Sequence, residues 1–252
     1  MNKIALITGA TAGFGKAIAE RLATEGCDVI ITGRRKERLD ELKLQIERTS
    51  GVRVLPLCFD VRRYEDVERY LGQLPDDWKK IDILVNNAGL AVGLNPIHQG
   101  VIDDWERMID TNVKGLLYVT RIVSPGMTER KSGHIINMGS IAGREVYPNG
   151  NVYCATKHAV KALSQAMRID LLQYGVKVTL IAPGFAETEF SLVRFKGDKA
   201  RADKVYEGMQ ALKAEDIADA VAFAVTAPAH VDIQDVLVMP KVQANSTLFH
   251  RE

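Results

Sequence analysis

A glycine-rich turn near the start of the chain constrains the fold more than any other stretch. It follows an apolar run at residues 3–8, which predicts a buried strand, and it leads into an expected helix at about 14–25. Glycines let the backbone come close to a phosphate, and a helix N-terminus offers amide donors and a favourable dipole. Such a turn can also be a simple tight connection. Between a first strand and a first helix, it favours a dinucleotide site.

The rest of the chain continues this alternation of strand and helix. Further helices are expected at 36–49, 64–74, 103–123 and 214–225, with a long one around Tyr153 that ends near 172–174. Further strands are expected at 28–32, 53–59, 81–85, 134–138, 177–182 and 236–239. No linker or repeat interrupts the 252 residues. The pattern predicts one doubly wound Rossmann-type α/β domain over 1–252, with a parallel sheet of about seven strands.

The composition of the chain indicates which kinds of binding partner and bound metal are not expected. The net charge is +1, with 33 basic and 32 acidic residues, so no electrostatic footprint for nucleic acid or a membrane surface is present. Cys27, Cys58 and Cys154 show no pairing pattern, which favours reduced thiols. The five histidines have no ligand spacing, so no metal is expected. The first strand begins by Lys3 and no apolar run has the length of a membrane span, so we expect a cytoplasmic protein.

Chemistry-bearing side chains gather in the stretch 138–157. Tyr153 and Lys157 are four residues apart and share a helix face, and Ser140 follows an apolar run at the expected carboxyl end of a strand. A phenol, an ammonium and a hydroxyl can together move a proton to or from a carbonyl oxygen. We expect Lys157 to lower the pKa of Tyr153 and Ser140 to hold the oxygen. Taken alone, the Tyr-Lys pair also fits an amphipathic helix with a surface lysine.

The end of the second strand predicts which dinucleotide binds. A site for NAD usually has an acidic residue about 20 residues after the glycines, to hold the ribose hydroxyls. Gly33 stands there instead, followed by Arg34 and Arg35, while Asp28 lies at the wrong end of the strand. Guanidinium groups match the 2′-phosphate of NADP. The two arginines can also be solvated residues before the next helix, but the missing acid favours NADP.

The spacing of these motifs resembles a known family. The turn reads Thr8-Gly9-x-x-x-Gly13-x-Gly15, not the common Gly-x-Gly-x-x-Gly, and it resembles that of the short-chain dehydrogenase/reductase family. The further motifs occur in the family's order, and the resemblance extends from Thr8 to Met239: Asn-Asn-Ala-Gly at 86–89, Tyr153-x-x-x-Lys157 and Pro183-Gly184-x-x-x-Thr188.

The resemblance implies hydride transfer between a nicotinamide and a substrate carbon that bears a hydroxyl. Tyr153 would be the general acid or base, Lys157 would lower its pKa and bind the ribose, and Ser140 would orient the substrate oxygen. An asparagine inside the expected helix at 103–123 completes the tetrad, since in the family it distorts the helix and orients a water that connects to the lysine. A tolerated mid-helix asparagine is the alternative. The catalytic set is Asn112, Ser140, Tyr153 and Lys157.

The resemblance also implies a cofactor-binding set. Asp60 and Val61 would border the adenine, although Asp60 can equally belong to the N-terminal cap region of the helix at 64–74. Thr188 would donate to the cofactor's phosphate. The cofactor-binding set is Gly9, Ala10, Thr11, Ala12, Gly13, Phe14, Gly15, Arg34, Arg35, Asp60, Val61, Asn87, Tyr153, Lys157, Pro183, Gly184 and Thr188.

Further stretches resemble the NADP-dependent 3-hydroxy acid dehydrogenase group, which acts on serine, allo-threonine and related small 3-hydroxy acids. They include Thr-Gly-Arg-Arg at 32–35, Thr-Glu-Phe-Ser-Leu-Val-Arg-Phe at 188–195 and Val-Leu-Val-Met-Pro at 236–240. A small acid needs a cationic anchor. Arg144, after Ser140, and Arg194, in an expected substrate lid at 189–210, are the candidates, and each can instead be a surface ion-pair partner. The substrate set is Ser140, Tyr153, Arg144 and Arg194.

Alternatives share the cofactor motifs. A reductase of another small aldehyde or ketone, such as a sulfonated aldehyde, a diketone or a 3-oxoacyl thioester, would differ mainly in the lid. A non-catalytic NADP-binding sensor has no need for the intact tetrad. The family commonly forms tetramers, and the apolar run 116–119 allows a homotetramer. The tail beyond Pro240 is expected to be mobile or bound to a partner.

Overall fold

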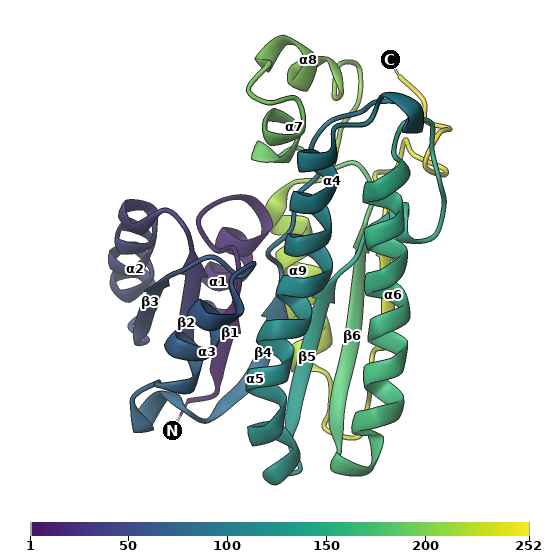
Figure 1. The fold of residues 1–252 in the computed structure, drawn as a ribbon. Coiled ribbons are helices and arrows are strands. Elements are labelled where there is room, and N and C mark those ends of the chain that lie inside the picture. The colour runs from purple at the N-terminus through teal and green to yellow at the C-terminus, as the bar shows by residue number, and fades with distance from the viewer. Residues whose placement is uncertain (1, 252) are drawn as a thin grey trace.

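A parallel sheet runs through the centre of the computed structural model, which describes residues 2–251 (Figure 1). Its seven strands lie in the order β3-β2-β1-β4-β5-β6-β7, and every neighbouring pair is parallel. The predicted fold class is therefore confirmed. The strands are β1 (Ile4–Ile7), β2 (Asp28–Gly33), β3 (Val54–Cys58), β4 (Ile81–Asn86), β5 (Gly133–Met138), β6 (Val176–Pro183) and β7 (Asp235–Val238).

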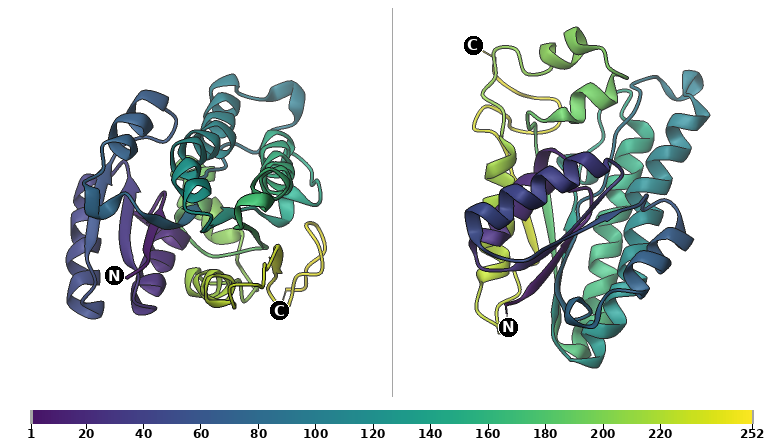
Figure 2. Two further views of the ribbon diagram at one scale, coloured as in Figure 1. Left: turned by 90° about the horizontal axis from the view of Figure 1, so that it is seen from below. Right: turned by 90° about the vertical axis from the view of Figure 1, so that its left-hand side faces the viewer.

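Helices cover both faces of the sheet, as the views in Figure 2 show. Side chains alternate along the strands, so Ile7 packs in one apolar cluster and Leu6 in the other. Strands that are buried on both faces are apolar along their whole length. One cluster includes α1 (Gly13–Thr24), α2 (Lys36–Ser50) and α9 (Ala214–Thr226), and the other includes α3 (Tyr64–Gly72), α5 (Leu116–Glu129) and α6 (Asn151–Leu171).

The strand order opens a crevice beside β1. The chain passes from β1 outward to β2 and β3, then returns to β4 on the other side of β1. The connections after β1 and β4 therefore leave in opposite directions, and ligands of such sheets bind where this happens, at the carboxyl ends of the strands. Beyond the same edge, two short helices follow β6, namely α7 (Glu189–Arg194) and α8 (Lys199–Lys204) (Figure 1).

The glycine turn after β1 depends on backbone conformations and spaces that side chains would not allow. Gly9 and Gly13 have φ values of +69° and +51°, in the left-handed region that L side chains rarely adopt. A methyl group on Gly15 would lie 2.3 Å from the carbonyl oxygen of Gly9 and 2.4 Å from Nδ2 of Asn87. Glycine at this position lets α1 start directly against the turn.

Hydrogen bonds from the Asn-Asn-Ala-Gly segment join the ends of the central strands. The hydroxyl oxygen of Thr8 accepts from the backbone N–H groups of Asn87 and Ala88, at 3.0 and 2.9 Å. Nδ2 of Asn87 donates to the carbonyl oxygen of Thr8 at 2.8 Å. Asn86 extends the connection to β5, because its Nδ2 donates to Oδ1 of Asn137 at 2.9 Å. The segment thus holds β1, β4 and β5 in register at the crevice.

The helix expected at 103–123 is interrupted at its middle. It consists of α4 (Ile102–Ile109), a π-helical stretch at Asp110–Gly115 and α5. π-bulges inside α-helices often mark functional sites. Asn112 lies within this stretch, so the distortion implied by the family resemblance is present.

Two expectations need correction. Asp60 caps no helix: α3 is preceded by Arg63, and Asp60 instead accepts from the backbone N–H and the guanidinium of Arg62. The tail after Pro240 folds back onto its own chain, where Oε1 of Gln243 accepts from the backbone N–H of Phe185 at 2.8 Å. Among residues 2–251, no helix is both long and apolar enough to cross a bilayer.

We expect Thr8→Val to lower the free energy of unfolding by about 1–3 kcal/mol, because the N–H of Ala88 loses its acceptor and the N–H of Asn87 loses one of its two acceptors while the shape is kept. Urea unfolding measures this. The control is Thr49→Val, an exposed position at the end of α2, which should change stability by less than about 0.5 kcal/mol. Equal effects of the two substitutions would contradict the assignment.

Candidate active site

A groove of about 320 Å³ runs along the carboxyl ends of β1, β2 and β4. The turn glycines form one wall, Arg34 and Arg35 lie at the end of β2, and Lys157 lies on α6. An elongated groove with backbone amides and cations fits a dinucleotide with phosphate groups. Most of the predicted cofactor-binding residues line it: Gly9, Thr11, Ala12, Gly13, Phe14, Arg34, Arg35, Asp60, Val61, Asn87, Tyr153, Lys157 and Thr188.

The other predicted cofactor-binding residues lie around the groove. Ala10 is buried behind the turn, where its N–H donates to the carbonyl oxygen of Thr32 at 2.8 Å. Gly15 also lies behind the turn, where it packs against the backbone of Gly9. Pro183 and Gly184 line an adjoining cavity of about 340 Å³.

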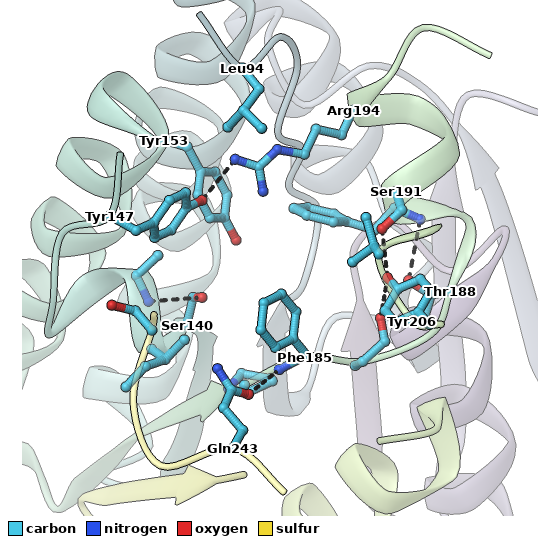
Figure 3. Close-up of a pocket in the computed structure, with 18 of the residues that line it drawn as sticks. Leu94, Ser140, Tyr147, Tyr153, Phe185, Thr188, Ser191, Arg194, Tyr206 and Gln243 are labelled. Atoms are coloured by element: carbon cyan, nitrogen blue, oxygen red, sulfur yellow. Dashed lines mark hydrogen bonds between the residues drawn. The ribbon is translucent and has the colours of Figure 1, made fainter. Parts of the chain in front are cut away.

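Tyr153 lines both the groove and the adjoining cavity. Figure 3 shows its hydroxyl pointing into the cavity, with Ser140 on the same side. Ser140 lies two residues after the end of β5, and its hydroxyl accepts from the backbone N–H of Ala142 at 3.1 Å, which orients the side chain. A substrate oxygen in the cavity can therefore meet the phenol and the serine hydroxyl while its carbon faces the groove.

Burial shifts the pKa values of Tyr153 and Lys157 in opposite directions. Burial raises the pKa of Tyr153, the nearby Tyr147 adds to the rise, and Ser140 and Arg194 act against it. Burial lowers the pKa of Lys157 to about 8. Its Nζ donates to the carbonyl oxygen of Met138 at 2.8 Å and lies 5.9 Å from the centroid of the Tyr153 ring.

The expectation that Lys157 lowers the pKa of Tyr153 is therefore wrong for this structure. Removal of water around the phenol outweighs the neighbouring charges, and the cation that lowers the pKa is Arg194.

Asn112 connects the strand-end loop to α6. Its Oδ1 accepts from the N–H of Leu90, and its Nδ2 donates to the carbonyl oxygen of Leu90, both at 2.8 Å. Nδ2 also donates to the hydroxyl of Thr156 at 3.0 Å. Thr156 directly precedes Lys157, so these bonds position the helix that carries Lys157. The water-orienting role of Asn112 stays a prediction.

The two candidate anchors lie in different places. The guanidinium of Arg194, at the end of α7, lines the cavity, donates to the hydroxyl of Tyr147 at 2.9 Å and lies 5.7 Å from the centroid of the Tyr153 ring (Figure 3). Arg144 does not line the cavity, because its guanidinium pairs with Asp235 on β7. The structure brings Arg194, and not Arg144, to Tyr153.

Comparison with known proteins shows the family of this chain. Residues 3–199 match the family described as short chain dehydrogenase. The chain belongs to the short-chain dehydrogenase family. It is 53% identical over 242 residues to the NADP-dependent 3-hydroxy acid dehydrogenase YdfG of Salmonella typhi, covering 96% of each chain. It is 45% identical to sulfoacetaldehyde reductase 2 of Chromohalobacter salexigens, covering 97% of this chain and 96% of that one.

A solved structure is similar in both sequence and fold. The closed form of serine dehydrogenase complexed with NADP+ is 50% identical, with a TM-score of 0.92, and the alignment covers 99% of this chain and 100% of that one.

Sequence reasoning missed several side chains at the site of this dehydrogenase. Tyr147 lies six residues before Tyr153, within the stretch that carries the catalytic candidates. Its position in the sequence could therefore have predicted that it lies at the site. Gln243 and Arg251 line the cavity only because the tail folds back, and no local pattern indicates this. Among the residues that the structure describes, no cluster of three metal-ligating side chains occurs.

The lowered pKa of Lys157 predicts a pH-dependent stability difference between this dehydrogenase and its Lys157→Met variant. Lysine has an ordinary pKa of 10.5 and here about 8, so between these pH values the unfolded chain holds a proton that the folded chain has released. The free energy of unfolding of the wild type relative to the variant should rise with pH in this window, by up to about 1.4 kcal/mol per pH unit. Below it the difference should be constant.

Urea unfolding from about pH 6.5 to about pH 9.5 tests the prediction. Parallel pH profiles for the two proteins would show that Lys157 keeps its ordinary pKa.

Proposed function

We propose that the protein is an NADP-dependent oxidoreductase that interconverts a small 3-hydroxy acid, of the serine, allo-threonine or 3-hydroxypropionate type, and its carbonyl form. The observation that carries the proposal is the placement of Arg194 and Tyr153 around one cavity that meets the cofactor groove. One small molecule can then present a carboxylate to the guanidinium and an oxygen to the phenol.

The protein's groups would act on the substrate oxygen. Tyr153 would donate its phenolic proton to the carbonyl oxygen during reduction, its phenolate form would accept the hydroxyl proton during oxidation, and Ser140 would hold the oxygen by a hydrogen bond. Lys157 would supply positive charge in the groove, close to the ribose. The bound cofactor supplies the hydride chemistry. Because the pKa of Tyr153 is raised by burial, the proton donor in the reducing direction would be a neutral phenol.

The preference for NADP is supported by the end of β2. Gly33 leaves no carboxylate to hold ribose hydroxyls, and Arg34 lines the groove there without an ion pair to any other residue in 2–251. A guanidinium without a carboxylate partner is suited to a phosphate. The NADP in the names of the similar dehydrogenase and of the solved complex supports the same cofactor.

The carboxylate of the substrate would bind Arg194. Among residues 2–251, no aspartate or glutamate lines the cavity, so within that range the guanidinium of Arg194 faces no carboxylate there. Aromatic side chains fill much of the remaining lining, including Tyr147, Phe185 and Phe190. An anionic group on a short carbon chain suits this combination of arginine side chains, Arg194 and Arg251, and apolar walls.

A reductase of a sulfonated aldehyde is the second candidate. A sulfonate carries the same charge as a carboxylate and would use the same guanidinium, and the similarity to a sulfoacetaldehyde reductase favours it over a diketone or a 3-oxoacyl thioester. The proposed assembly is a homotetramer in the cytoplasm. Leu117 on α5, and Ile169 and Leu172 at the end of α6, are large apolar side chains at the surface and are available for contacts between subunits.

Absorbance of the reduced nicotinamide tests the function with purified protein, either NADP or NAD, and a panel of substrates. Turnover of serine, threonine isomers and 3-hydroxyisobutyrate with NADP, with little turnover of plain secondary alcohols, is the expected result. Reduction of sulfoacetaldehyde without oxidation of the hydroxy acids would favour the second candidate. No turnover of any of these compounds would refute the proposal.

We expect Arg194→Ala to raise KM for hydroxy acids about 10- to 100-fold, the range that corresponds to losing a charge-assisted hydrogen bond. KM for an uncharged secondary alcohol should change little. Arg144→Ala is the matched control, because it removes the same group from an ion pair outside the cavity. Steady-state kinetics on both substrate types decides. If Arg194→Ala affects charged and uncharged substrates alike, Arg194 is not the anchor.

A further inference from the structure

An ion-pair cluster joins the first turn of α7 to the start of α2. Oε2 of Glu189 accepts from the guanidinium of Arg35 at 3.0 Å, and Oε1 accepts from that of Arg38 at 2.7 Å. Burial raises the pKa of Glu189, but the hydrogen bonds and charges of the two arginines outweigh it and hold the pKa below its ordinary value. The carboxylate is therefore charged at neutral pH and binds two cations from another part of the chain.

The cluster lies at the rim of the cofactor groove. Arg35 and Glu189 both line the groove, whereas Arg38 does not. Arg35 also donates from Nε and a terminal nitrogen to the hydroxyl of Thr11, at 3.1 and 2.8 Å. Side chains thus connect three segments around the groove, namely the glycine turn, the start of α2 and the start of α7.

The net positive charge beside this cluster can accommodate a phosphate group. Arg34 lines the same end of the groove and makes no hydrogen bond to another residue that the structure describes. Three arginines against one carboxylate leave two positive charges, and a sugar phosphate carries nearly two negative charges at neutral pH. Arg34 can then serve a 2′-phosphate while Arg35 and Arg38 keep Glu189.

The pairs contribute little to the stability of the fold. The side chains of Arg35, Arg38 and Glu189 are 42%, 44% and 44% exposed, and exposed ion pairs are usually worth about 0–1 kcal/mol each. That magnitude suits a contact that opens and closes. At its other end the same six-residue helix carries Arg194, so a movement of α7 would reach both the groove and the substrate cavity.

We propose that Arg35, Arg38 and Glu189 form a clasp across the cofactor groove. The clasp holds α7 over the bound cofactor, so the two ion pairs must break before the cofactor leaves. It also sets the position of Arg194. This inference rests on the proposed cofactor function, since it takes the groove to be the dinucleotide site.

The dissociation rate of NADPH tests whether these ion pairs slow the release of the cofactor. In stopped-flow displacement, followed by nicotinamide fluorescence, Glu189→Gln should raise the dissociation rate about three- to tenfold, which corresponds to losing one or two exposed ion pairs. Arg38→Ala should raise it by a similar factor, although Arg38 does not line the groove. The double variant should be no faster than Glu189→Gln alone, because both changes break the same contact. Glu47→Gln, which removes a paired carboxylate from the far end of α2, should have no effect.

The release of NADH, which lacks the 2′-phosphate, distinguishes the clasp from direct binding of the phosphate by these residues. The clasp acts on the helix over the cofactor, so Glu189→Gln and Arg38→Ala should speed the release of NADH by about the same factor as that of NADPH. Arg38→Ala could instead speed the release of NADPH but not of NADH, and could still do so in a protein that already carries Glu189→Gln. That result would show that Arg38 binds the 2′-phosphate and would overturn the proposal. If Glu189→Gln released NADPH more slowly than the wild type, the carboxylate of Glu189 would be competing with the phosphate for the arginines. That result would also overturn the proposal.

Amide hydrogen exchange gives a second measurement that does not depend on release. Exchange in α7 of the NADPH complex should be faster in Glu189→Gln and Arg38→Ala than in the wild type, with no change in the strands. Unchanged exchange in α7 would contradict the clasp. The wild type alone tests the underlying function: if it binds NADPH no more tightly than NADH, the cofactor proposal fails independently of any variant.

Discussion

The hydrogen bonds between Thr8 and the segment after β4 are the contacts on which the site depends. They hold together the two strand ends from which the chain departs in opposite directions. A parallel sheet would otherwise end there in unpaired backbone groups, and a glycine turn with left-handed residues has few other contacts to fix it. Because Thr8 and Asn87 satisfy those groups, the crevice keeps its shape and the glycine amides face one groove.

Burial dominates the electrostatics of the candidate catalytic residues Tyr153 and Lys157. The interior disfavours charge on both Tyr153 and Lys157, which keeps the phenol neutral and makes the lysine a weaker base than it is in water. The site therefore does not start with an ionised phenol. Its charged members stand at the edge of the cavity, where Arg194 stacks near the two tyrosine rings and can compensate an anion.

Residues of α7 line both the cofactor groove and the adjoining cavity. The segment expected as a polar lid at 189–210 contains α7 and α8, and α7 has opposite charges at its two ends. Its first residue, Glu189, pairs with Arg35 just before α2 and with Arg38 in α2, and its last residue contacts Tyr147. Tyr206, from beyond α8, donates to the carbonyl oxygen of Ala186 at 2.8 Å and so joins this segment to the turn after β6.

The sequence by itself determined the seven strands, the position of the glycine turn, the candidate catalytic residues and the missing acid after β2. These features follow from local rules, because apolar periodicity, glycine spacing and strand order depend on residues close in the chain. Only the tertiary structure decided between Arg144 and Arg194, gave Arg35 a carboxylate partner, raised the pKa of Tyr153 and placed Gln243 in the cavity. The ends of long side chains and the degree of burial depend on segments far apart in sequence, which no local pattern specifies.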